Sequence, residues 1–257
     1  MSSYDMKKIV LLSRKSFLAK IQTHIAKIEI NKIKKNIIDI HYSSSVGDKD
    51  LSAKAWEQHG FGIFTNSLSK KLVLKEADVV VHSYKDLPVK NLNKTSFVCL
   101  KRDDPRDIIL IKRSSLNKKK LVIGTSSPRR KYYLKKLKEF LPFQELKSIQ
   151  IRGNVPSRLE KVLNSSKEDG LFIAKAAIDR ILKYGQKIDK KEYKNFRLNF
   201  EKFEKVILPI SKFPSAAAQG CIALEFRNDD EKIKKILEKI NHMPTSEDCY
   251  KERKYLY

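Results

Sequence analysis

Short runs of apolar, β-branched residues alternate with helical patterns along most of this chain, and this alternation limits the folds open to it. Each run is bounded by turn-forming residues, which is typical of a buried strand. The runs span 8–12, 37–41, 78–82, 108–111, 121–124, 149–151 and 171–173. The helical patterns span 17–30, 66–77, 129–141, 157–164 and 176–184. Strands that alternate with helices predict an α/β fold with mixed, largely parallel sheets.

A charged segment with a proline, Asp103–Asp107, interrupts the alternation, and a second sheet is predicted to begin after it. The later run Val206–Ile210 has the composition of a strand that returns to the first domain. We therefore expect a discontinuous first domain of residues 1–103 and 206–227, a second domain of residues 104–205, and a further segment of residues 228–257.

The composition narrows the choice of partner. The 257 residues are 41% hydrophobic and carry a formal net charge of +25, which excludes a disordered tail and favours an anionic partner: nucleic acid, anionic lipid or an acidic small molecule. The three cysteines are widely spaced, and the histidines lack paired spacing, so the sequence predicts neither a disulfide framework nor a metal site. No apolar run is long enough to span a membrane. These features favour the cytoplasm, or an organelle stroma in a eukaryote.

Polar side chains follow several predicted strands, at the edge where doubly wound sheets bind ligands. Lys85 and Asp86 follow one strand, as a cation beside a carboxylate that can stabilise a developing positive charge. The alternative for such a pair is a solvated ion pair in a loop.

In the other predicted domain, a strand runs into Gly124-Thr-Ser-Ser-Pro-Arg-Arg130, a helix start with two arginines. Arginine in a first helical turn opposes the macrodipole by about 0.3 to 1 kcal/mol, so its presence favours a docked anion. The alternative is a simple Ser-Pro helix start whose arginines face water.

The same arrangement recurs at Ile151-Arg-Gly-Asn-Val-Pro-Ser-Arg-Leu159, and Ser13-Arg-Lys-Ser16 repeats the strand-to-helix pattern near the N-terminus. Arg180 follows another strand. Arginine binds carboxylates bidentately and stays charged. These repeated helix starts therefore predict a cleft for a molecule with several acidic groups.

Five stretches of the sequence together resemble the hydroxymethylbilane synthase, or porphobilinogen deaminase, family. They are VVVHSYKDLPV (79–89), RDDPRD (102–107), GTSSPRR (124–130), IRGNVPSRL (151–159) and AAAQGCIALEFR (216–227). The resemblance extends from about Lys8 to Arg253, in family order. It implies two periplasmic-binding-protein-like (type II) domains and a small third domain, of which residues 228–257 would be a remnant that forms its first helix.

The resemblance also implies the reaction and its residues. The substrate would be porphobilinogen, four units of which are deaminated and joined into a linear tetrapyrrole on a covalent dipyrromethane cofactor. Asp86 would be catalytic with Lys85 beside it. The groups that bind the carboxylates of substrate and cofactor would be Arg14, Ser16, Ser83, Thr125, Ser127, Arg129, Arg130, Arg152, Arg158 and Arg180.

The sequence departs from the family pattern in several places. The family attaches its cofactor to the cysteine of a Gly-Gly-Cys loop, which this sequence lacks; the expected cysteine would lie beyond Tyr257. Cys249 aligns one turn upstream, in a helical pattern. Val46 stands where the family has a basic residue, and Phe61 stands where it has a lysine. Ser67 stands where an acidic residue is common in the family.

Three functions stay open from the sequence. The first is an active hydroxymethylbilane synthase, a transferase. The second is a degenerate paralogue that binds acidic pyrroles without turnover. The third is a basic nucleic-acid-binding protein, which the motifs disfavour because the arginines follow strands instead of lining one helix. We expect a monomer with no membrane partner and no specific nucleic acid.

Overall fold

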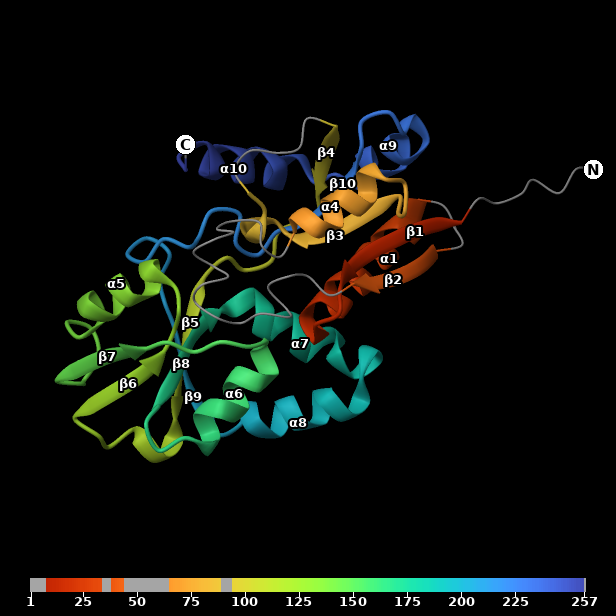
Figure 1. Cartoon of the computed structure of the whole chain (residues 1–257). Helices are drawn as coiled ribbons and strands as arrows, with labels where there is room; N and C mark the ends of the chain where they lie inside the picture. The colour runs from red at the N-terminus through yellow and green to blue at the C-terminus, as the bar shows by residue number, and fades with distance from the viewer. Residues whose placement is uncertain (1–7, 34–37, 44–64, 89–93, 257) are drawn as a thin grey trace, which may run out of the picture. The chain divides into compact units, whose positions relative to one another are not determined.

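The computed structural model describes residues 8–33, 38–43, 65–88 and 94–256 (Figure 1). The chain divides into two compact units: unit 1 comprises residues 1–103 and 220–257, and unit 2 comprises residues 104–219. Each unit contains one five-stranded sheet. Positions 46 and 61, two of the places where the sequence departs from the family pattern, lie outside the described residues.

The described residues of unit 1 form ten elements. They are β1 (Ile9–Arg14), α1 (Phe17–Ile33), β2 (Ile38–Ser43), α4 (Asn66–Val73), β3 (Val79–Ser83), the 3₁₀ turn η1 (Tyr84–Asp86), β4 (Thr95–Cys99), β10 (Ile222–Arg227), α9 (Glu231–Glu238) and α10 (Met243–Lys254). The strand order is β2-β1-β3-β10-β4. β1 is parallel to β2 and β3, whereas β10 is antiparallel to both of its neighbours, so the sheet is mixed.

Helices cover both faces of this sheet, because its strands carry apolar residues on both sides. On one face, Leu11 and Val79 pack against Ile30 of α1 and Leu237 of α9. On the other face, Leu12 and Val80 pack against Leu68 and Leu72 of α4. The alternation of side chains along a strand thus places neighbouring residues in two separate cores.

Unit 2 contains another ten elements. They are β5 (Asp107–Lys112), the 3₁₀ turn η2 (Arg113–Ser115), β6 (Lys120–Gly124), α5 (Pro128–Leu137), β7 (Glu145–Ile149), α6 (Val155–Asn164), β8 (Gly170–Ala174), α7 (Lys175–Ile188), α8 (Lys190–Phe200) and β9 (Phe203–Ile207). The order is β7-β6-β8-β5-β9, with β5 antiparallel to β8 and β9. Unit 2 therefore repeats the topology of unit 1, and β5 takes the place of β10.

The core of unit 2 forms around its two central strands, β5 and β8, in which every residue is buried. Ile109 and Phe172 pack with Tyr133 and Leu137 of α5. Gly170 begins β8 where the backbones approach closely: a Cβ there would overlap the carbonyl oxygen of Leu110. A glycine at this position allows β8 to pair with β5.

The structure confirms the α/β class and the mixed sheets, and it corrects two boundaries. The expected return of the chain to the first domain at Val206–Ile210 is wrong, because β9 pairs with β5 inside unit 2. The chain returns instead at Gly220 and forms β10, drawn in blue in Figure 1. The strand expected at Ile149–Ile151 is β7, which ends at Ile149.

Residues 228–257 belong to unit 1 by their packing, because Ile233 and Leu237 of α9 lie in its core. They contain two helices, α9 and α10, where one was expected. Their assignment to the start of a third domain stays a prediction. Among the described residues, none of the helices has both the length and the apolar character needed to cross a membrane.

Candidate functional site

In unit 1, the predicted site residues lie at one edge of the sheet. Arg14 is the last residue of β1 and Ser83 the last of β3, and these two strands are parallel neighbours, so their carboxyl ends meet at the same edge. Ser16 stands just before α1, where its Oγ accepts a hydrogen bond from the backbone N–H of Ala19 at 3.4 Å. Ser83 Oγ accepts a hydrogen bond from Gln22 of α1 at 2.7 Å.

Lys85 and Asp86 follow Ser83 in η1, and both are half-buried. Arg253 of α10 binds the backbone on both sides of them: its Nη1 donates to the carbonyl oxygens of Tyr84 (3.1 Å) and Leu87 (3.3 Å). Its guanidinium also lies over the Tyr84 ring, 4.6 Å from the centroid. Because the planar guanidinium has several donors in fixed directions, one buried arginine fixes the turn that carries Lys85 and Asp86.

Below this turn, a buried carboxylate joins four elements. Glu225 of β10 accepts hydrogen bonds from Ser69 (2.7 Å) and Thr95 (2.8 Å), and it pairs with His82 Nε2 at 2.8 Å. Burial acts to raise the pKa of Glu225, but the contacts with His82, Ser69 and Thr95 outweigh burial and leave this pKa below its usual value. The ionised Glu225 therefore ties the end of β3 to α4, β4 and β10.

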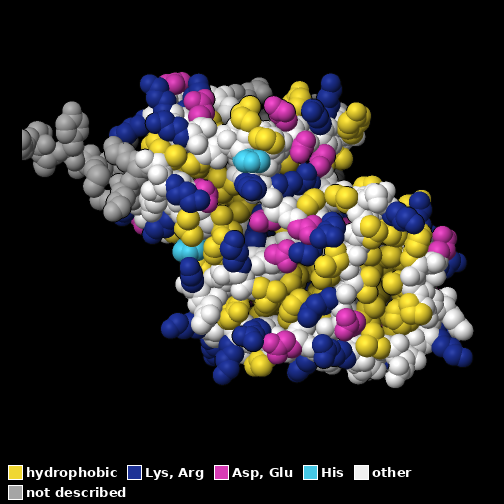
Figure 2. All heavy atoms as spheres, turned by 180° about the vertical axis from the view of Figure 1, so that it is seen from behind, with side chains coloured by type: hydrophobic (Ala, Val, Ile, Leu, Met, Phe, Trp, Pro, Cys, Tyr) yellow, Lys and Arg dark blue, Asp and Glu magenta, His cyan; other side chains and the backbone are white. Residues whose placement is uncertain are grey.

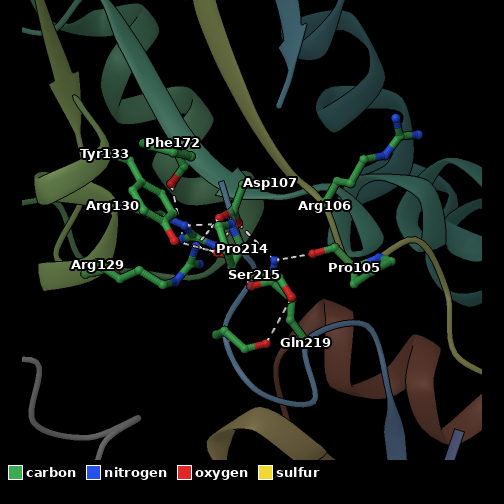
Figure 3. A network of polar contacts seen from close by, with 12 residues as sticks. Pro105, Arg106, Asp107, Arg129, Arg130, Tyr133, Phe172, Pro214, Ser215 and Gln219 are labelled. Carbon is green, nitrogen blue, oxygen red and sulfur yellow. Dashed lines mark hydrogen bonds and ion pairs between the residues drawn. The ribbon is translucent and has the colours of Figure 1, made fainter. Parts of the chain in front are cut away.

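In unit 2, Asp107 is the centre of the corresponding edge (Figure 3). Its carboxylate is fully buried and binds Arg129 Nη1 at 2.6 Å through Oδ2 and Arg130 Nη2 at 2.8 Å through Oδ1. Gln219 Nε2 donates to Asp107 Oδ1 at 2.9 Å and to the carbonyl oxygen of Pro105 at 2.7 Å. In Figure 3 both arginine side chains point toward Asp107, whereas Arg106 points away.

This arrangement explains two arginines in the first turn of α5. Burial acts to raise the pKa of Asp107, but Arg130 and Arg129 outweigh it and lower this pKa. The ionised carboxylate supplies the negative charge that the start of α5 would otherwise lack. Arg130 is itself buried and also donates to the carbonyl oxygen of Phe172, whereas the side chain of Arg129 is 24% exposed.

The helices α5 and α6 of unit 2 begin in different ways. Thr125 follows β6 and is buried, and its Oγ1 accepts a hydrogen bond from the backbone N–H of Ser127, the residue before α5. Asn154 caps α6 by accepting from the backbone N–H of Ser157 at 2.8 Å. Ser127 makes no such cap bond, so its hydroxyl and the first N–H groups of α5 can bind an anion.

The remaining predicted residues of unit 2 are placed on both sides of α6 and in α7. Arg152 lies in the segment between β7 and α6, and Arg158 lies in the first turns of α6. Both are half-buried, and Arg158 Nε donates to the carbonyl oxygen of Asn154 at 3.4 Å. Arg180 is a buried residue of α7, 5% exposed. Their roles in binding stay predictions.

Positive charge is spread over the surface. On the face shown in Figure 2, Lys and Arg side chains are scattered over both units and interspersed with Asp and Glu. In the described part of the chain, no three or more His, Cys, Asp or Glu side chains are arranged so that they could hold a metal ion.

The residues present fit the carboxylates of a dipyrromethane. Uncapped N–H groups at α5, the Ser127 hydroxyl and the partly exposed Arg129 are donors that suit carboxylates. The three cysteines do not fit its attachment, since Cys99, Cys221 and Cys249 are all buried. Ser67, one of the departures from the family pattern, has a buried Oγ with no hydrogen-bond partner among the described residues.

Sequence reasoning missed Asp107, Gln219, His82 and Glu225. All four lie in the stretches that carry the family resemblance, RDDPRD, AAAQGCIALEFR and VVVHSYKDLPV. The available signal was the uncompensated arginine pair, which required a buried carboxylate somewhere in the same domain.

Comparison with known proteins shows which family the chain resembles. A family model described as "Porphobilinogen deaminase, dipyromethane cofactor binding domain" matches residues 9–235. The porphobilinogen deaminase of Prochlorococcus marinus (strain MIT 9215) is 31% identical over 257 residues, which cover 97% of this chain and 74% of that protein. The probable porphobilinogen deaminase of Picrophilus torridus is 36% identical over 245 residues, 94% of this chain and 77% of that protein.

Among solved structures, the periplasmic aliphatic sulphonate binding protein SsuA from Escherichia coli covers 88% of this chain and 63% of its own, at 10% identity and a TM-score of 0.44. This likeness is too weak to support an inference. The family model and the sequence relatives each cover most of the chain. The chain therefore belongs to the porphobilinogen deaminase family, transferases of tetrapyrrole biosynthesis that carry a dipyrromethane cofactor.

Proposed function

We propose that this chain is a hydroxymethylbilane synthase, which deaminates four porphobilinogen units and joins them head to tail into a linear tetrapyrrole. The observation that carries the proposal is the turn η1, where Asp86 is half-buried at the carboxyl edge of the unit 1 sheet and Arg253 holds the flanking backbone. A carboxylate held in this way keeps its position while charge develops on a substrate.

The chemistry assigned to Asp86 follows from the substrate. Loss of ammonia from porphobilinogen leaves an electron-poor pyrrole with positive charge shared by the ring nitrogen. A fixed carboxylate that accepts a hydrogen bond from this N–H stabilises the cation before the next pyrrole carbon attacks it. Lys85, adjacent in the same turn, supplies a cation for a substrate carboxylate.

The acidic side chains of porphobilinogen explain the other residues. Each unit carries an acetate and a propionate, so the growing product gains two carboxylates with each addition. We assign their binding to Arg14, Ser16 and Ser83 of unit 1 and to Thr125, Ser127, Arg129, Arg130, Arg152, Arg158 and Arg180 of unit 2. When bound, the dipyrromethane supplies the terminal pyrrole to which the first porphobilinogen is joined.

The direct test is incubation of the purified chain with porphobilinogen, with ammonia and the linear tetrapyrrole measured together. The proposal expects both products in a ratio of four ammonia to one tetrapyrrole. Binding of porphobilinogen without ammonia release, by a chain that carries its dipyrromethane, would instead identify a degenerate paralogue. The comparisons give that alternative no support.

We further propose that the protein acts as a cytoplasmic monomer, with no membrane partner and no specific nucleic acid. The dispersed cations in Figure 2 support this on the face shown, because nucleic-acid-binding domains gather cations into a patch. Sedimentation at working concentration tests the monomer, and retention on DNA at physiological salt tests the exclusion of nucleic acid.

A further inference from the structure

All three cysteines of the chain meet in one place in unit 1. Cys99 ends β4, Cys221 immediately precedes β10, and Cys249 lies in α10. All three are free thiols, and none is more than 3% exposed. Each thiol influences the ionisation of the other two, so their side chains are close neighbours. We call these three residues the thiol cluster.

The strand register decides which pair of thiols can be joined. β4 and β10 are antiparallel, with Ala223 opposite Cys99, so Cys221 is the diagonal neighbour of Cys99 on the same face. Such diagonal pairs are about 7 to 8 Å apart between Cα atoms, beyond the roughly 7 Å that a disulfide spans. Cys249 approaches this face from a helix, so its position is not fixed by the sheet. The register therefore disfavours a bond between Cys99 and Cys221 and leaves Cys249 as the other possible partner of Cys99.

Helix α10 buries three residues, and Cys249 is the middle one. The three are Thr245, Cys249 and Arg253, one on each successive turn. Thr245 Oγ1 accepts from the backbone N–H of Arg102 at 3.1 Å, and Arg253 binds the carbonyl oxygens around η1. A covalent change at Cys249 therefore acts on the helix whose Arg253 holds the turn of Lys85 and Asp86.

The cluster also favours a thiolate. Hydrogen bonds from the thiols of Cys221 and Cys249 lower the pKa of Cys99, with help from Ser246 and Arg253 and against the effect of burial. The same contacts raise the pKa of Cys221. Of the three thiols, Cys99 is therefore the one whose surroundings favour the thiolate, which is the form of cysteine that reacts with electrophiles.

We propose that the thiol cluster is an oxidation site, at which a small hydroperoxide converts Cys99 and Cys249 into a disulfide. The Cys99 thiolate attacks a peroxide oxygen, the O–O bond breaks, and the second oxygen leaves as hydroxide or alkoxide. The Cys249 sulfur then attacks the sulfenic acid on Cys99, and the hydroxyl leaves as water with the thiol proton. In sum, two thiols lose two electrons and two protons, and the peroxide is reduced. The low exposure excludes bulky disulfides as oxidants.

The chemical test uses hydrogen peroxide on the folded full chain, followed by alkylation in denaturant and mass spectrometry of unreduced peptides. We expect two of the three thiols to be lost and one linked peptide pair, containing Cys99 and Cys249. C221S should form the same bond, whereas C249S and C99S should not form it. Survival of all three thiols, under conditions that oxidise the unfolded chain, would overturn the proposal. So would a Cys99–Cys221 bond in the wild-type chain, which needs no variant to fold.

The consequence for activity rests on the proposed function and has its own readout. Oxidised wild-type chain and oxidised C221S should turn over porphobilinogen several-fold more slowly, with recovery on reduction by dithiothreitol, whereas C249S should keep its rate in peroxide. A disulfide without a change in rate would refute the coupling to η1. Absence of turnover before oxidation would refute the proposed function, while the thiol measurements would still decide the oxidation site.

Discussion

The Nη2 atom of Arg130 lies 2.8 Å from the Oδ1 atom of Asp107, and this carboxylate is completely buried. Arg129 binds the second oxygen of the same carboxylate at 2.6 Å. One residue of β5 thus receives two consecutive guanidinium groups from the first turn of α5. The pair of arginines is therefore part of the framework of unit 2, and the side chain of Arg129 is more exposed to a ligand than that of Arg130.

Asp107→Asn is expected to destabilise unit 2 by about 3 to 5 kcal/mol, because it leaves two arginines without their buried counter-charge. The measurement is urea unfolding at pH 7. Glu201→Gln is the control: Glu201 also pairs with an arginine, Arg197, at 3.0 Å, but both side chains are more than half exposed. The control should lose no more than about 1 kcal/mol. Equal losses in both variants would contradict a special role for Asp107.

The contribution of Asp107 to the free energy of unfolding should also depend on pH. Folding lowers the pKa of this carboxyl group, so its stabilising effect is complete above the unfolded value, near pH 4, and is lost as the pH falls through the folded value. The difference in free energy of unfolding between the wild-type chain and Asp107→Asn should therefore be constant from pH 7 to about pH 5 and shrink in stronger acid. A difference that grows on acidification would contradict a pKa that folding lowers.

Arg129 and Arg130 should respond differently to truncation. Arg130→Ala removes a buried guanidinium that also binds Phe172 and Gln219, and we expect a loss of about 3 to 5 kcal/mol in stability. Arg129→Ala should cost about 1 to 3 kcal/mol and raise the KM for porphobilinogen. Unfolding curves and steady-state rates on the same preparations separate the two effects. A larger stability loss in Arg129→Ala than in Arg130→Ala would contradict the view that Arg130 is the more important of the two for the framework of unit 2.

Glu225→Gln should destabilise unit 1 by about 3 to 5 kcal/mol, because a neutral amide replaces a buried carboxylate that accepts from Ser69, Thr95 and His82. Glu204→Gln on the exposed side of β9 serves as the control and should be nearly neutral. Thermal unfolding followed by circular dichroism compares them. A neutral result for Glu225→Gln would mean that the carboxylate adds nothing to the connection of β3 with α4.

Asp86→Asn should abolish most porphobilinogen turnover without changing the unfolding curve, because the half-buried side chain is not part of a core. Asp229→Asn is the control, since the Asp229 side chain is 71% exposed and lies 3.9 Å from its ion-pair partner Arg227. Rates of ammonia release and urea unfolding are measured for both. Undiminished turnover in Asp86→Asn would remove this residue from the catalytic assignment.

The sequence by itself determined the α/β class, the positions of most strands and helices, and the family. The spacing of apolar residues and the positions of turn-forming residues are local properties of a sequence. They therefore predicted the buried runs that form β1, β3, β5, β6 and β8. The motif GTSSPRR likewise predicted a helix start after a strand, and α5 begins there at Pro128.

Only the tertiary structure decided what those residues contact. Asp107 meets Arg129 and Arg130 because β5 runs antiparallel to β8, with Asp107 opposite Ala174, and no local pattern encodes that register. The same holds for β9, whose composition suits either sheet and whose pairing with β5 keeps it in unit 2. The three cysteines come together for the same reason: pairing between strands and docking of α10 depend on contacts between residues far apart in the chain.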